Sequence, residues 1–83
     1  MSFVLPGLSG GELALLLARY GYGVTRQTGS HLRLTSTLKG PEHHVTIPQH
    51  KALKVGTLNA ILTDVAAYLE MDRAGLAEAL FGR

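Results

Sequence analysis

The stretch "HLRLTSTLKGPEHHVTIP", residues 31–48, contains the pattern that decides the fold. In residues 31–38 leucines alternate with polar side chains, which is typical of a strand with one buried face. Gly40 and Pro41 then indicate a turn, and residues 43–47 repeat the alternation. The pattern predicts two antiparallel strands whose buried face carries Leu32, Leu34, Leu38, Val45 and Ile47.

A shorter strand is expected just before this pair, at residues 24–27, with Gly29 and Ser30 as the connecting turn. Three strands that are joined by short turns favour an antiparallel meander. One face of this sheet holds the apolar side chains. The opposite face is then open, polar and basic, and it carries His31, Arg33, Thr35, His44 and Thr46.

A helix with both ends marked is expected ahead of the strands. Ser9 and Glu12 fit the capping box, in which each side chain satisfies a free backbone N–H group of the first turn. Gly21 is placed to end the helix in the left-handed conformation. The apolar stripe between these signals consists of Leu13, Leu16, Leu17 and Tyr20.

Two further apolar stripes at helical spacing follow the strands, and Asp72 is placed to cap the second of them. The apolar stripes of the helices and the apolar face of the sheet are expected to bury each other, so the helices should cover one face of the sheet only. The predicted fold class is α+β, in the order α-β-β-β-α with a short C-terminal helix, as a single domain over residues 1–83. The stripes are Leu58, Ile61, Leu62, Val65 and Leu69, then Leu76, Ala77, Leu80 and Phe81.

Composition limits the classes of function that the chain can have. The 83 residues are 46% hydrophobic and 17% charged, which is typical of a globular chain. There is no cysteine, so neither a disulfide framework nor a thiolate metal site is expected. No apolar run is long enough to span a membrane and no signal peptide is indicated, so a cytoplasmic protein is expected.

Charge is concentrated in the middle of the chain. Between Arg19 and Lys54 there are six basic side chains against the single carboxylate of Glu42, and all four histidines lie in the same stretch. A basic middle of this kind favours a polyanion as partner, although a merely solvated basic surface gives the same pattern. His43 and His44 point to opposite faces of their strand, so neither a zinc site nor any other cofactor is expected.

Three short motifs in this order resemble the HicA family of bacterial and archaeal toxins, over roughly residues 8–66. The first is a Gly-Ser-His segment at the start of the second strand. The second is a valine, proline and histidine motif at the end of the third strand, in which Ile47 replaces the usual valine. The third is a Lys-x-Gly-Thr-Leu segment at the start of the next helix. The matching residues are Gly29, Ser30 and His31; Ile47, Pro48 and His50; and Lys54, Gly56, Thr57 and Leu58.

The resemblance implies an αβββα fold similar to double-stranded-RNA-binding domains, and the activity of an mRNA interferase. His31 would be the essential general acid or base, with no metal required, because the RNA carries its own nucleophile in the 2′-hydroxyl group. A HicB-like antitoxin would be the partner, and we expect it to cover the face that bears His31. Phosphate and RNA contacts are expected from Gly29, Ser30, Arg33, His44, His50 and Lys54.

Other interpretations of the same residues remain open from the sequence. Gly29 and Ser30 are also an ordinary turn, and an exposed strand histidine such as His31 often has no role. His44 is either a second acid–base group or a polar surface residue. The chain as a whole is therefore a metal-independent endoribonuclease, a non-catalytic RNA-binding module, or a domain whose open face binds a protein. Residues 67–83 extend beyond the shortest members of the family.

Overall fold

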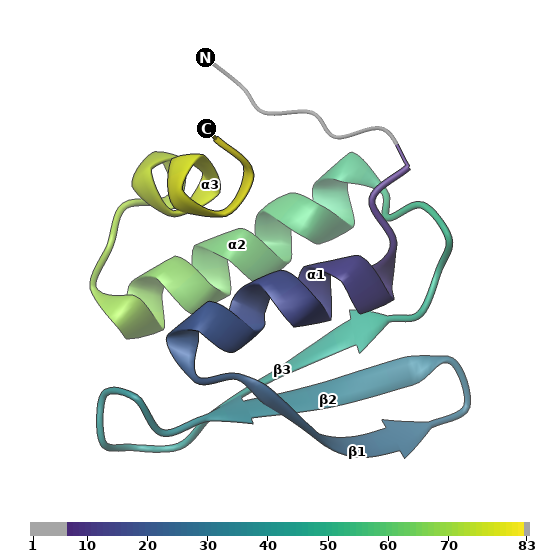
Figure 1. Ribbon diagram of the computed structural model, residues 1–83, viewed down its shortest axis with the longest axis horizontal. Helices are drawn as coiled ribbons and strands as arrows, with labels where there is room; N and C mark the ends of the chain where they lie inside the picture. Colours follow the sequence, from purple (N-terminus) through teal and green to yellow (C-terminus); the bar gives the residue numbers. More distant parts are fainter. Residues whose placement is uncertain (1–6, 83) are drawn as a thin grey trace.

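A computed structural model of the chain describes residues 7–82. The predicted order of elements is confirmed, and the helices lie on one side of the sheet (Figure 1). The elements are α1 (Gly10–Leu17), the 3₁₀ helix η1 (Ala18–Tyr20), β1 (Gly23–Thr28), β2 (His31–Ser36), β3 (His43–Pro48), α2 (Val55–Leu69) and α3 (Arg73–Phe81).

The sheet is the expected antiparallel meander, with strand order β1-β2-β3. In β2 and β3 the predicted alternation is confirmed, because Leu32, Leu34, Val45 and Ile47 are all buried. Their burial against the helices leaves the polar face of β2 and β3 open. Strand β1 is an edge strand, and every one of its residues is exposed.

The expectation that Leu38 lies in the core is wrong. Strand β2 ends at Ser36, and the side chain of Leu38 is 56% exposed. Ser36 takes the last inward position of the strand instead, and its hydroxyl donates a hydrogen bond to the carbonyl of Tyr20 at 2.8 Å. The alternation therefore holds to residue 36 and fails where the backbone leaves the sheet.

The local signals of α1 are confirmed. Ser9 accepts a hydrogen bond from the N–H of Glu12, and the Glu12 carboxylate accepts one from the N–H of Ser9. The helix tightens into η1 and stops at Gly21, which has a φ of +81°. This stop turns the chain back so that β1 can run along the sheet beneath α1 (Figure 1).

Helix α2 lies between the sheet and α3, and α3 lies on the far side of the helices from the sheet (Figure 1). All five residues of the predicted stripe on α2 are buried. The carboxylate of Asp72 caps α3 by accepting a hydrogen bond from the N–H of Gly75 at 3.1 Å. Arg19 of η1 donates to the carbonyl of Ala79 at 2.9 Å, which ties α3 to the first helix. In the part of the chain described, no helix has the length and apolar character needed to cross a membrane.

Helix α1 begins in direct backbone contact with the end of β3. A Cβ atom on Gly10 would collide with the carbonyl oxygen of Pro48, so no other residue fits there without movement. The N–H group of Gly10 donates to the carbonyl of His50 at 3.0 Å. Glycine thus lets the N-terminus of α1 dock on the segment from Pro48 to His50, which we call the β3 exit segment.

We predict that Gly10→Ala destabilises the fold by about 1–3 kcal/mol, because the added methyl group collides with backbone that cannot rotate away. Gly11→Ala is the matched control, since a Cβ atom there meets only the Ser9 hydroxyl at 4.0 Å and alanine favours helix. Urea unfolding of both variants checks this. Equal stability of the Gly10 and Gly11 variants would contradict the close contact.

Candidate functional site

His31 is the first residue of β2, the central strand of the sheet. Its neighbours across the sheet are Thr28 of β1 and Pro48 of β3. The side chain is exposed on the open face, as the alternation predicted. Within residues 7–82 no hydrogen bond or ion pair engages its imidazole. A central strand thus fixes the backbone of His31 and leaves the ring free to meet a ligand.

The turn before His31 is held by the β3 exit segment. Gly29 has a φ of +55°, which matches a two-residue hairpin turn with glycine at its first central position. The carbonyl of Ser30 accepts a hydrogen bond from the N–H of Gln49 at 2.6 Å. Gln27 also reaches this segment, with its side-chain amide 3.3 Å from the amide oxygen of Gln49. The turn is therefore fixed from both sides, and a Cβ atom on Gly29 would meet nothing within 4 Å.

The structure brings part of the predicted set together. Gly29, Ser30 and His31 are contiguous, and Arg33 follows two residues later on the same open face of β2. His50 comes two residues after Pro48, the neighbour of His31 in β3. Gly29, Ser30, His31 and Arg33 form what we call the turn site, at the end of the sheet where β2 begins. Among residues 7–82 no hydrogen bond or ion pair joins the side chain of His50 to it.

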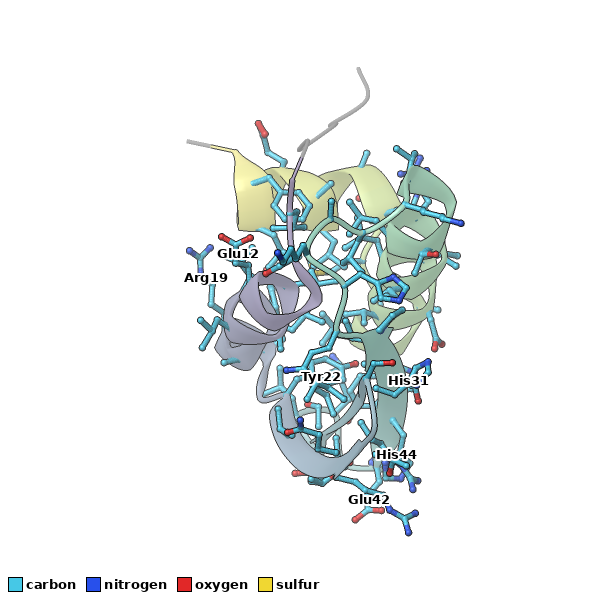
Figure 2. The ribbon with its side chains drawn as sticks, turned by 90° about the vertical axis from the view of Figure 1, so that its right-hand side faces the viewer. Glu12, Arg19, Tyr22, His31, Glu42 and His44 are labelled. Atoms are coloured by element: carbon cyan, nitrogen blue, oxygen red, sulfur yellow. The ribbon has the colours of Figure 1, made fainter. Side chains whose placement is uncertain are left out.

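His44 belongs to the other end of the sheet. It is opposite Thr35, four residues along β2 from His31, which corresponds to roughly 13 Å. Its ring nitrogens contact the hydroxyl of Thr35 at 2.7 Å and the carboxylate of Glu42 at 3.4 Å. Figure 2 presents His31 and His44 on the same side of the molecule, with His44 next to Glu42. The two imidazoles share a face but are too far apart to act on one phosphodiester.

Lys54 is the residue that precedes α2, and its side chain is exposed. Among the described residues no hydrogen bond or ion pair joins it to the turn site. The described residues also form no pocket and contain no group of three or more metal-ligating side chains. The turn site is thus an open surface, suited to a ligand that lies along the sheet.

A second cluster was missed by sequence reasoning. The hydroxyl of Tyr22 lies 2.6 Å from Nδ1 of His43, and Nε2 of His43 lies 3.1 Å from the carboxylate of Asp64. One tautomer satisfies both contacts, with Tyr22 donating to Nδ1 and the Nε2–H group donating to Asp64. The ring of Tyr68 stacks on His43 with the centroids 4.7 Å apart. This cluster, the β3 clasp, joins β3 to α2 and to the segment after η1.

The position of the β3 clasp indicates a structural role. Tyr22 is 3% exposed, so its hydroxyl cannot meet a large ligand. Burial raises the pKa of Tyr22 well above its ordinary value of 10.0, with smaller contributions from Tyr68 and Asp64. No local signal in the sequence could have revealed the clasp, because its members come from three distant segments.

Comparison with known proteins gives one result for the sequence. Residues 10–66 match the model of a protein family described as the HicA toxin of bacterial toxin–antitoxin systems. The matched range runs from the start of α1 into α2 and contains the whole turn site. No curated protein and no solved structure matches the chain. Helix α3 lies outside the range of the family model.

We predict that Tyr22 makes the fold less stable at high pH. In the unfolded chain Tyr22 ionises near its ordinary pKa of 10.0, whereas burial keeps it neutral in the folded state. The contribution of Tyr22 to the free energy of unfolding is therefore complete below about pH 10. It is lost as the pH rises further, by up to about 1.4 kcal/mol per pH unit.

Urea unfolding between pH 8 and pH 11 checks this by comparing Tyr22→Phe with the wild type. The Phe variant should lose about 0.5–1.5 kcal/mol at pH 8, because the hydrogen bond to His43 is gone, and should show a shallower decline above pH 10. If the stability of Tyr22→Phe and that of the wild type fell equally steeply above pH 10, Tyr22 would not be the cause of the decline.

Proposed function

The chain belongs to the HicA family, the toxins of bacterial toxin–antitoxin systems, and we propose that it acts as a metal-independent endoribonuclease that cleaves mRNA. His31 is the general acid or base of the reaction. The observation that carries the proposal is the position of His31. It has a fixed backbone at the end of the central strand, a free imidazole on the open face, and a glycine turn beside it.

The RNA supplies the nucleophile. His31 accepts the proton of a ribose 2′-hydroxyl group while the 2′ oxygen attacks the adjacent phosphorus atom. The bond between phosphorus and the 5′ oxygen then breaks, and the leaving oxygen takes up a proton. The products are a 2′,3′-cyclic phosphate and a 5′-hydroxyl end. Histidine suits this role because its ordinary pKa of about 6.5 lies near the working pH.

The residues around His31 have supporting roles in this proposal. The free N–H groups of a glycine turn attract anions, so Gly29 and Ser30 would hold a non-bridging phosphate oxygen. A Cβ atom on Gly29 would meet no other described residue within 4 Å, which leaves room for the approach of the phosphate. Arg33, two residues along the open face, would pair with a phosphate of the same strand. Lys54 would contribute only long-range attraction, since no hydrogen bond or ion pair links it to the turn site among the described residues.

If a second histidine donates the proton to the leaving oxygen, His50 is a better candidate than His44. His50 belongs to the β3 exit segment, whose residue Gln49 is bonded to Ser30 beside His31. His44 is bonded to Thr35 and Glu42 at the opposite end of the sheet. From the sequence, His44 was either a second acid–base group or a polar surface residue. We propose His50 for the acid–base role in its place.

A toxin of this class is paired with an antitoxin. We propose a HicB-like protein that covers the open face of the sheet, including His31 and Arg33. The support is chemical: a ribonuclease must be silenced, and this face is polar, basic and left free by the helices. Acidic groups on the antitoxin would complement it and speed the encounter. Because mRNA is the substrate, the cytoplasm is the expected location.

The second candidate function is a non-catalytic RNA-binding module. The open basic face that supports the nuclease supports this module equally well, and only cleavage separates the two. Binding of RNA that weakens with salt, without any cleavage, would favour the module.

We predict that His31→Ala lowers the rate of RNA cleavage by about 10²–10⁴-fold, because it removes a general acid–base group. Stability should change by less than about 0.5 kcal/mol, since the exposed ring fills no cavity. The assay uses purified protein with EDTA, so that a contaminating metal-dependent nuclease cannot contribute. His44→Ala is the matched control and should retain most of the activity. Equal cleavage by the wild type and the His31 variant would remove His31 from the mechanism.

We also predict that the antitoxin blocks access to His31. Histidine modification by diethyl pyrocarbonate, followed by mass spectrometry, should label His31 in the free toxin and leave it protected in the complex. His50 and His44 report in the same experiment how far the covered area extends. A complex in which His31 is labelled as fast as in the free toxin would contradict direct blocking.

A further inference from the structure

Two arginines face each other across the β1–β2 hairpin. Arg26 of β1 is the direct neighbour of Arg33 of β2, and both side chains are exposed. Direct neighbours on antiparallel strands project from the same face, with their Cβ atoms about 5 Å apart. Arg33 lies on the open face, so Arg26 does too. The two-residue turn at Gly29 and Ser30 sets this pairing, and the register shifts only beyond it, between Val24 and Arg26.

Among residues 7–82 no carboxylate balances the pair. The chain has six acidic residues, and none of them forms an ion pair or hydrogen bond with either arginine. Glu42, the acidic residue nearest in sequence to these strands, contacts His44 instead. The other five are used in helix caps, in the β3 clasp, in an ion pair with Lys39, or lie on α3.

Like charges directly opposite each other destabilise a sheet. The arginine pair therefore lowers the stability of the fold, and a neutral residue at position 26 would relieve the repulsion. An anion placed between the two guanidinium groups turns the repulsion into attraction, because each arginine can donate to a phosphate in bidentate fashion. The pair is arranged as a clamp for one phosphate group.

We propose that Arg26 and Arg33 together bind one phosphate of the RNA backbone, next to the phosphodiester that is cleaved. Arg33 lies two residues from His31 on the same face, or about 7 Å along the strand. That distance excludes the clamped phosphate from the reaction at His31 and makes it a neighbour on the same RNA strand. Arg26 thus joins the site as a binding residue, and the register of the β1–β2 hairpin is the feature that brings it there.

The inference rests on the part of the proposed function that puts RNA on the open face. Binding of a 2′-O-methyl RNA oligonucleotide tests it, because this probe binds without being cut by 2′-hydroxyl attack. Arg26→Gln should weaken binding about eightfold at 0.1 M salt and reduce the salt slope by about one. The matched control is Arg73→Gln on α3, which removes the same charge from the helical side and should leave both values unchanged.

A melting experiment at low salt supplies the second measurement. Arg26→Gln should melt at the wild-type temperature or a few degrees higher, because the repulsion with Arg33 is removed. Weaker binding from a damaged fold would instead be accompanied by a lower melting temperature. That combination would overturn the proposal.

The outcomes separate this inference from the proposed nuclease. If the wild type binds the probe but cuts no unmodified RNA in EDTA, the nuclease proposal fails and the clamp stands. If Arg26→Gln binds the probe as tightly as the wild type, the clamp is refuted whether or not RNA is cut. If that variant instead loses affinity only for the antitoxin, the pair belongs to a protein interface and the proposal is overturned. If the wild type binds no RNA, both proposals fail.

Discussion

The contact between Gly10 and the β3 exit segment is the constraint on which the rest of the structure depends. Glycine allows the backbone of α1 to meet the carbonyl of Pro48, and the N–H group of Gly10 bonds to His50. One residue away, Gln49 bonds to Ser30 in the turn before β2. The same short segment therefore docks the first helix on the sheet and fixes the turn before His31. A packing constraint on the covered side of the sheet thus sets the geometry of the open side.

The elements of the fold were predictable because their signals act over a few residues. The capping box at Ser9, the stop at Gly21 and the alternation along β2 and β3 each depend on neighbours in sequence. The prediction failed at Leu38 because alternation cannot tell where a strand leaves the sheet. Contacts between distant segments, such as Gly10 with Pro48 or the β3 clasp, leave no local pattern.

The candidate site was predictable only in part, for a related reason. The turn site follows from contiguous residues and from the phase of one strand, so the resemblance and the alternation agree on His31. Cross-strand neighbours depend on register instead. The turn at Gly29 and Ser30 sets the register that brings Arg26 opposite Arg33, and the pairing of β2 with β3 puts His44 far from His31. The turn predicted at Gly29 and Ser30 implies this register, so Arg26 could have been found by pairing the two strands residue by residue.

The central claim is that the ribose of the RNA, activated at the turn site, is the nucleophile. The most direct test is to identify the ends of the fragments that the purified toxin produces from RNA in the presence of EDTA. The account predicts 2′,3′-cyclic phosphate or its 3′-phosphate hydrolysis product on one fragment and a 5′-hydroxyl group on the other, with no cleavage at a 2′-deoxy nucleotide. Fragments with 5′-phosphate ends, or cleavage at 2′-deoxy positions, would contradict it.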